Sequence, residues 1–148
     1  MASHRVLIGF LTLASLLAIV ACDEDKETPN QPIPQSTVRF TAAAFDGSEG
    51  LRSVSVHLRC DAAVAAAVSV RCATSDSSAT AGEDYTGIDR SVAFAAGDTA
   101  QTVSIDVIGD GVVEGDETFI VSLSAESGPV KIGYPGRAVV RLQDDDSK

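Results

Sequence analysis

Four carboxylates crowd a short segment between two apolar stretches of the sequence: Asp110, Glu114, Asp116 and Glu117 all fall within Gly109–Phe119. Ionised carboxylates held this close raise one another's pKa unless a cation screens them. Calcium takes about six to eight oxygen ligands, often from carboxylates on loops. Because Glu114 and Glu117 are three residues apart, both side chains can turn toward one ion. The segment therefore has the composition of a calcium-binding loop.

Three further stretches place carboxylates at the ends of apolar segments. Asp144–Asp146 follow the last such segment, Asp84 lies within Gly82–Thr86, and Glu49 lies in a turn rich in glycine. We expect the four stretches to meet at one end of the fold and to bind a cation there. The alternative is an acidic, solvated rim that keeps the protein soluble. An EF-hand is not expected, because the D-x-[DN]-x-[DN]-G pattern fails when it is started at Asp106.

Length and charge narrow the remaining classes of function. The chain has 148 residues, of which 45% are hydrophobic and 5% aromatic, with no Trp. This composition suffices for one domain with a core of mostly Val, Ala, Leu and Ile. A net charge of −10 argues against binding nucleic acid or anionic lipid through a basic patch.

Catalytic motifs are missing from the sequence, which has no G-x-S-x-G, no P-loop and no H-E-x-x-H. His57 is the one histidine after the N-terminal segment, and it is expected on an outward strand face. Zinc would need clusters of His and Cys, which are absent. A small sandwich with few aromatic residues to stack a sugar is also a poor glycosidase. We therefore predict no catalytic residues, no residues that bind an organic cofactor, and a protein that is not an enzyme.

The start of the chain has the features of an export signal. His4 and Arg5 precede Val6–Val20, an almost wholly apolar run that is short for a membrane span of about 20 residues. The run ends in Leu17–Cys22, which resembles the bacterial lipobox, where a small residue precedes a Cys that is modified. The resemblance implies cleavage before Cys22, with acyl chains on the new N-terminus as the anchor. The alternative is an ordinary signal peptide with a chance Cys.

This interpretation divides the chain into a signal peptide over 1–21, a lipidated N-terminus and tether over 22–36, and a folded domain over 37–146. The tether carries Pro29, Pro32 and Pro34 and almost no apolar residues, so it cannot fold alone. We expect a lipoprotein of the bacterial cell envelope that its lipid holds at a membrane, facing the periplasm or the exterior.

Hydrophobic residues alternate along most of the remaining chain, which is typical of half-buried strands. Turn residues separate the alternating stretches, except that Ala43–Gly50 is expected to form a turn or bulge and Ala125–Gly136 a long irregular connection. About seven short strands in a domain of this size predict an all-β fold, an immunoglobulin-like antiparallel β-sandwich. The expected strands are Thr37–Ala42, Ser53–Cys60, Val68–Thr74, Ser91–Phe94, Thr102–Ile108, Thr118–Ser124 and Arg137–Leu142.

Four stretches share their residues, order and spacing with a known family. They are 80–86 (T-A-G-E-D-Y-T), 92–94 with the following Gly97-Asp98, 107–119 and 139–146. Together they resemble the Calx-beta domain, a calcium-binding module also found in sodium–calcium exchangers and in an integrin β subunit. The resemblance covers roughly 37–146, essentially the whole expected domain, and it implies the same β-sandwich.

The resemblance also implies which residues would bind calcium. One departure lowers the expected affinity, because Gly109-Asp110-Gly111 stands where strong binders have consecutive aspartates. We therefore expect one or two weakly bound calcium ions. The implied ligands are Glu49, Asp84, Asp110, Glu114, Glu117, Asp144, Asp145 and Asp146, with Val112 offering a backbone carbonyl.

We expect an adhesion or structural role for this calcium-binding module. Two alternatives stay open: a calcium-independent protein–protein interaction module, and an accessory or inhibitory subunit of an exported enzyme. The expected partners are the membrane, through the lipid anchor, and a protein, but no nucleic acid.

Cys60 and Cys72 are expected to form a disulfide. Once Cys22 is lipidated the remaining cysteine count is even, and export places the pair where disulfides persist. Both fall on the apolar faces of consecutive strands. The alternative is two separate buried thiols, because the Ala-rich connection between them can hold them too far apart for a bridge.

Replacing the acceptor of the lipid tests the predicted anchor. The Cys22→Ser chain should not be processed at this position and should lose acyl labelling, because the thiol that receives the lipid is gone. Labelling with a radioactive or clickable fatty acid in a bacterial host measures this. Acylation that persists in Cys22→Ser would contradict the prediction.

Overall fold

The computed structural model describes residues 34–146; the predicted signal peptide, Cys22 and nearly all of the tether lie outside the described residues. Within 34–146, nine strands form two sheets without any helix, which confirms the predicted all-β sandwich. A helix long and apolar enough to cross a membrane is accordingly not found in this part of the chain.

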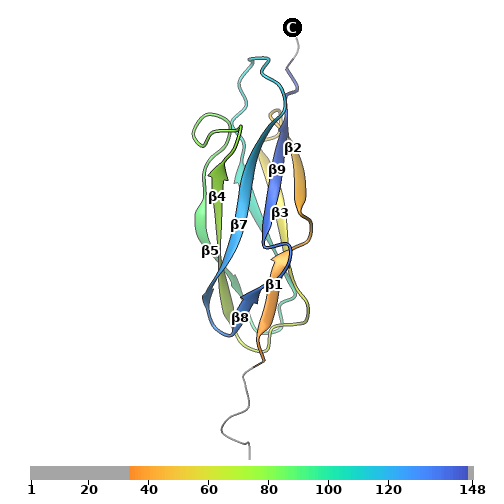
Figure 1. Ribbon diagram of the computed structural model, residues 1–148, viewed down its shortest axis with the longest axis vertical. Coiled ribbons are helices and arrows are strands. Elements are labelled where there is room, and N and C mark those ends of the chain that lie inside the picture. Colours follow the sequence, from red (N-terminus) through yellow and green to blue (C-terminus); the bar gives the residue numbers. More distant parts are fainter. Residues whose placement is uncertain (1–33, 147–148) are drawn as a thin grey trace, which may run out of the picture. The chain divides into compact units, whose positions relative to one another are not determined.

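The two sheets are mostly antiparallel (Figure 1). One sheet has the strand order β6 (Ala100–Asp106), β3 (Ser53–Cys60), β1 (Ser36–Phe40), β8 (Val130–Ile132). The other has the order β2 (Ala44–Ser48), β9 (Arg137–Gln143), β7 (Glu117–Ser127), β4 (Val68–Asp76), β5 (Asp89–Phe94). Two pairs, β1 with β8 and β2 with β9, are parallel.

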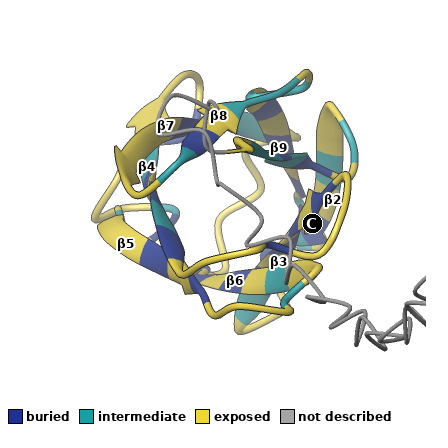
Figure 2. Ribbon diagram, turned by 90° about the horizontal axis from the view of Figure 1, so that it is seen from below, coloured by how far each residue is buried: buried dark blue, intermediate teal, exposed yellow. Residues whose placement is uncertain are grey.

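The core lies between the sheets and follows from the alternation in the sequence. Along β3, the side chains of Val54, Val56, Leu58 and Cys60 are buried, and each is followed or preceded by an exposed residue. Figure 2 shows buried segments on all sides of the space that the strands enclose. Burial of these apolar faces is the main force that holds the two sheets together.

Two stretches that were expected to be irregular form strands. Ala43–Gly50 contains β2, which pairs in parallel with β9. Gly47 favours close packing of β2, since a Cβ at this position would lie 3.2 Å from the Cβ of Val54 and 3.3 Å from the Cδ2 of Leu142. Ala125–Gly136 contains the end of β7 and the three residues of β8, which pairs with β1. In both stretches a pairing partner far along the chain overrides local turn preferences.

The disulfide expected between Cys60 and Cys72 is wrong for this structure, in which both cysteines are buried, free thiols. Their strands are consecutive in the chain but belong to different sheets, because β3 lies in the four-stranded sheet and β4 in the five-stranded one. Each thiol therefore packs as a small apolar side chain in its own part of the core.

Both thiols should react with a thiol reagent only after the chain is unfolded. Burial raises the pKa of the Cys72 thiol to about 11, so little reactive thiolate forms at neutral pH. In a Cys22→Ser chain, a maleimide should label neither cysteine in the folded state and both in denaturant without reductant. Mass spectrometry reads the count directly, and a denatured, unreduced chain without labelled cysteines would show that a bridge forms after all.

Candidate metal centre

Four segments meet at the end of the sandwich where β2, β4, β6 and β9 finish and β7 begins (Figure 1). They are the turn after β2 with Glu49, the loop after β4 with Asp84, the connection 107–116 between β6 and β7, and the segment 144–146 after β9. The acidic stretches singled out from the sequence therefore come together, in two groups of three carboxylates.

Glu49 is the centre of the first group. Its side chain is buried, with 8% of the residue exposed, and its Oε1 has no hydrogen-bond partner. Carboxylate oxygens of Glu49, Asp144 and Asp146 lie within 4.8 Å of one another. Burial, followed by the charges of Asp144 and Asp146, raises the pKa of Glu49. A cation at this point would supply the missing partner and offset the repulsion.

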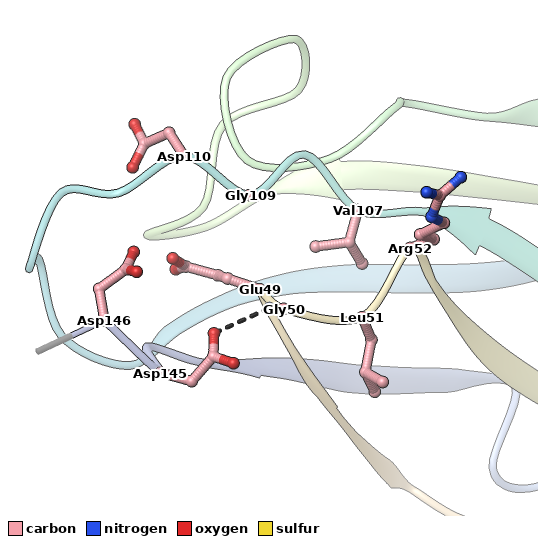
Figure 3. Close-up of a pocket in the computed structure, with 9 residues that line it drawn as sticks. All are labelled: Glu49, Gly50, Leu51, Arg52, Val107, Gly109, Asp110, Asp145 and Asp146. Carbon is pink, nitrogen blue, oxygen red and sulfur yellow. Dashed lines mark hydrogen bonds between the residues drawn. The ribbon is translucent and has the colours of Figure 1, made fainter.

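The first group borders a cleft of about 330 Å³ between the turn after β2 and the loop after β6. Figure 3 shows the carboxylate of Glu49 directed into the space between Asp110 and Asp146. Gly109 brings this loop close, because a Cβ there would strike the backbone carbonyl oxygen of Glu49. A glycine at position 109 is thus a packing requirement of this chain.

The second group consists of Asp84, Glu114 and Glu117, whose carboxylate oxygens also lie within 4.8 Å of one another. They line a larger cleft of about 560 Å³. Glu117 has a buried Oε2 without a hydrogen-bond partner. Its pKa is raised by burial first and then by the charge of Asp84. The second group therefore shares both features of the first, an unpartnered oxygen and a repelled charge.

Asp144 holds the loops of the two groups together. Its Oδ2 accepts hydrogen bonds from the backbone N–H groups of Glu114, at 2.8 Å, and Gly115, at 2.9 Å. Its Oδ1 accepts one from the N–H of Asp146 at 2.9 Å. The backbone donors, with that of Asp146 first, lower the pKa of Asp144, so this carboxylate stays ionised beside Glu49.

The structure leaves two of the predicted carboxylates, Asp110 and Asp145, outside both groups. Asp110 lines both clefts, but its Oδ1 accepts from the N–H groups of Gly111 and Val112 and orders its own loop. For Val112 the predicted ligand is the backbone carbonyl; its N–H donates to Asp110, and its side chain is exposed. Asp145 lines the first cleft, but its Oδ1 accepts the N–H of Gly50 at 2.8 Å (Figure 3).

Two residues that support the second group were missed in the sequence analysis. Asp76 accepts a hydrogen bond at 2.6 Å from the hydroxyl of Tyr85, which is fully buried. Asp76 stands in a polar stretch that predicts a loop, and nothing in its spacing connects it with Tyr85. Asp116, in contrast, belongs to neither group and forms an ion pair with Arg141 at 2.8 Å.

Both groups offer carboxylate oxygens alone. Among the described residues, His57 is exposed as predicted and shares a hydrogen bond with Thr102, while both cysteines are buried in the core. Oxygen-only donor sets suit hard cations such as calcium rather than zinc or copper, which favour nitrogen and sulfur. The fold and these groups define a β-sandwich module with two potential sites for a hard cation.

The chain belongs to the Calx-beta domain family, whose sequence profile matches residues 34–146. It is 40% identical over 78 residues to the sodium/calcium exchanger Calx of Drosophila melanogaster, across 53% of this chain and 8% of the exchanger. It is 36% identical over 120 residues to the extracellular matrix organizing protein FRAS1 of Mus musculus, across 76% of this chain and 3% of that protein. The chain thus corresponds to a small part of the length of these relatives.

Solved structures agree with this assignment. The apo-form Calx CBD1 domain superimposes with a TM-score of 0.72 at 30% identity, covering 76% of this chain and all of that chain (100%). The calcium binding domain CBD12 of CALX1.1 superimposes with a TM-score of 0.70 at 31% identity, covering 74% of this chain and 46% of that chain. The β-sandwich of this chain is therefore the Calx-beta fold.

Without calcium, the chain should become more stable as the pH falls from 7 toward about 5. The pKa values of Glu49 and Glu117 are raised in the folded state, so the folded state binds protons more tightly than the unfolded state. Their destabilising charge disappears as pH falls through the folded pKa values, and the gain is complete below the unfolded value. Thermal unfolding in chelator measures this.

The Glu49→Gln chain isolates one contribution to that pH dependence. At pH 7 in chelator its free energy of unfolding should be about 1 kcal/mol higher than that of the parent chain, since the substitution removes a buried charge that neighbouring carboxylates repel. Its stability should also change less between pH 7 and 5. A Glu83→Gln chain, which neutralises an exposed acid outside both groups, serves as the control. Equal pH dependence in the parent and Glu49→Gln would contradict the assignment.

Proposed function

We propose that the chain is an exported, lipid-anchored Calx-beta module that binds one or two calcium ions and has an adhesion or structural role. The observation that carries the proposal is the carboxylate of Glu49, which is buried, lacks a partner at Oε1 and faces Asp144 and Asp146. Such a group is costly unless a cation is bound beside it.

Calcium fits the two groups better than magnesium does. Three carboxylates supply three to six oxygens, depending on how many bind in bidentate fashion, and backbone carbonyls or water complete the shell. Calcium accepts such variable geometry, whereas magnesium demands a near-ideal octahedron and gives up its water reluctantly. Glu49, Asp144 and Asp146 would hold one ion, and Asp84, Glu114 and Glu117 the other.

The expected affinity is that of extracellular calcium modules, with a dissociation constant of about 10⁻⁴ to 10⁻³ M. Gly109 and Gly111 contribute no carboxylate, and Asp110 and Asp145 are engaged with backbone N–H groups. Fewer charges at an ion lower its affinity. The relatives include a calcium binding domain of CALX1.1 and sodium/calcium exchangers, which supports calcium as the ion.

Export and anchoring rest on Leu17–Cys22, outside the described residues. Related proteins named as extracellular matrix proteins support a location at the cell surface. We propose bacterial lipidation at Cys22 and a binding function without catalysis, in line with the role of Calx-beta domains as binding modules.

A calcium-independent docking function is the second candidate. Leu51, Val112 and Val113 are 54%, 52% and 43% exposed and lie on loops at the same end as the carboxylates. Exposed aliphatic side chains gathered on one end favour contact with a protein. Under this alternative the acids would provide solubility and charge rather than ion ligands.

Calcium should raise the thermal stability of the parent chain. At about one hundred times the dissociation constant, binding adds about 2.7 kcal/mol to the free energy of unfolding. Glu117→Gln should lose the part of this gain that comes from the second group. Differential scanning calorimetry with chelator and with calcium at about 10 to 100 mM, one hundred times the expected dissociation constant, measures both.

Asp116→Asn is the matched control, because it neutralises an acid of the same loop that is paired with Arg141 and belongs to neither group. It should retain the full calcium response. If calcium does not change the melting temperature of the parent chain, the calcium site is contradicted. The acidic, solvated rim and the calcium-independent docking function then remain as interpretations. A response that Glu117→Gln leaves intact would restrict calcium to the Glu49 group.

A further inference from the structure

The loop after β4 is held at two points by one side chain that is not a candidate ligand. Oδ1 of Asp76, the last residue of β4, accepts the N–H of Ala81 at 2.9 Å and the hydroxyl of Tyr85 at 2.6 Å. Asp84 lies between these two attachment points in the chain. The position of its carboxylate therefore depends on the contacts of Asp76.

Tyr85 connects this loop with the strand that carries Glu117. Its ring is fully buried and stacks on Phe119, with ring centroids 4.0 Å apart and planes inclined by 9°. Phe119 stands two residues after Glu117 on β7. The stack of Tyr85 on Phe119 thus joins the residue next to Asp84 to β7, the strand that carries Glu117.

Short-range contacts complete the support of Asp84. Its Oδ2 accepts the N–H of Thr80 at 2.6 Å, its N–H donates to the carbonyl of Thr80 at 3.0 Å, and its carbonyl accepts the N–H of Ile108 at 2.9 Å. Only one oxygen of the carboxylate is used in this way. The other is free to face Glu114 and Glu117, provided that the loop keeps its place.

From these contacts we infer that Asp76 and Tyr85 are a positioning pair that sets the calcium affinity of the group Asp84, Glu114 and Glu117. This inference rests on the proposed calcium function and goes beyond it by assigning control of one group to residues outside it. Neither Asp76 nor Tyr85 is a member of the two groups of three carboxylates. The hydroxyl of Tyr85 holds the loop against Asp76, and its ring holds the loop against β7.

Variants that each keep one of the two carboxylate groups distinguish a positioning role of Asp76 and Tyr85 from an effect on general stability. Glu49→Gln leaves the Asp84 group intact, and Glu117→Gln leaves the Glu49 group intact. Tyr85→Phe is then added to each; it removes the hydroxyl but keeps the buried ring and its stack on Phe119. Isothermal titration of the purified chains with calcium alone gives the affinity of each group.

Tyr85→Phe should weaken calcium binding about tenfold in the Glu49→Gln chain, because a hydrogen bond to a charged acceptor is lost. In the Glu117→Gln chain the change should stay within about twofold, since no hydrogen bond of the described residues joins Glu49, Asp144 or Asp146 to the loop after β4. Tyr134→Phe makes the same substitution at a tyrosine that is 85% exposed and should change neither affinity.

Asp76 provides a second variant, at an exposed position where failure to fold is less of a risk. In the Glu49→Gln chain, Asp76→Ala should weaken binding about tenfold, and Asp76→Asn should weaken it less, because its amide oxygen still accepts both hydrogen bonds. This graded rescue distinguishes positioning from loss of charge near the site, which both variants share.

Three outcomes would overturn the inference. One is an unchanged affinity of the Asp84 group in Tyr85→Phe and Asp76→Ala. Another is an equal loss in both groups, which would indicate general destabilisation. The third is a Glu49→Gln chain that binds no calcium while the parent does, because the Asp84 group would then not be a site. A parent chain that binds no calcium would instead refute the proposed function, and the inference with it.

Discussion

The free energy of holding Glu49 ionised in a buried position governs the carboxylate end of this sandwich. Its neighbours Asp144 and Asp146 add repulsion to desolvation, and both effects raise its pKa. A fold would normally replace such a residue or give it a cationic partner. Here the charged groups that act on Glu49 from 107–116 and from 144–146 are all acidic, so the arrangement stores an unfavourable electrostatic energy that a cation can remove.

Asp144 shows how the fold tolerates this concentration of charge. Its oxygens accept backbone N–H groups from 114–115 and from Asp146, which stabilise the ionised form and lower its pKa. The two carboxylates therefore have different properties at short range. Asp144 is a fixed anion that orders the loops, whereas Glu49 has the oxygen without a partner. A cation placed between them would have Asp144 as a rigid ligand and would offset the desolvation and repulsion of Glu49.

The two groups of carboxylates are also joined by charge. Glu114 raises the pKa of Glu49 as well as that of Glu117, and Glu49 itself contributes to the raised pKa of Glu117. Neutralising one group therefore lowers the cost of keeping the other ionised. Binding of a first cation would favour ionisation of the second group, although the electrostatic contribution falls with ionic strength to the extent that the clefts are open to solvent.

Alternation in the sequence predicted most of the fold, because burial of one face leaves a direct mark on strand composition. Ser53–Cys60 was predicted with its observed bounds as β3. β2 and β8 were missed, since Ala44–Ser48 and Val130–Ile132 become strands only through parallel partners distant in the chain. The disulfide failed for a related reason: neighbouring stretches of sequence do not reveal that β3 and β4 enter different sheets.

The ligands could be predicted as a set of segments, but their selection depends on backbone geometry. The two-residue alternation of β9 continues past its end, so Asp144 and Asp146 share a group with Glu49 while Asp145 points to Gly50. A run of three aspartates therefore contributes two carboxylates to one site and one side chain to loop structure. Gly109 follows the same logic, because the close approach of the Glu49 carbonyl, rather than the demand for charge, decides which residue fits there. The number of acids in a segment thus gives an upper limit to its ligands, and the direction of each Cβ determines how many of them reach the ion.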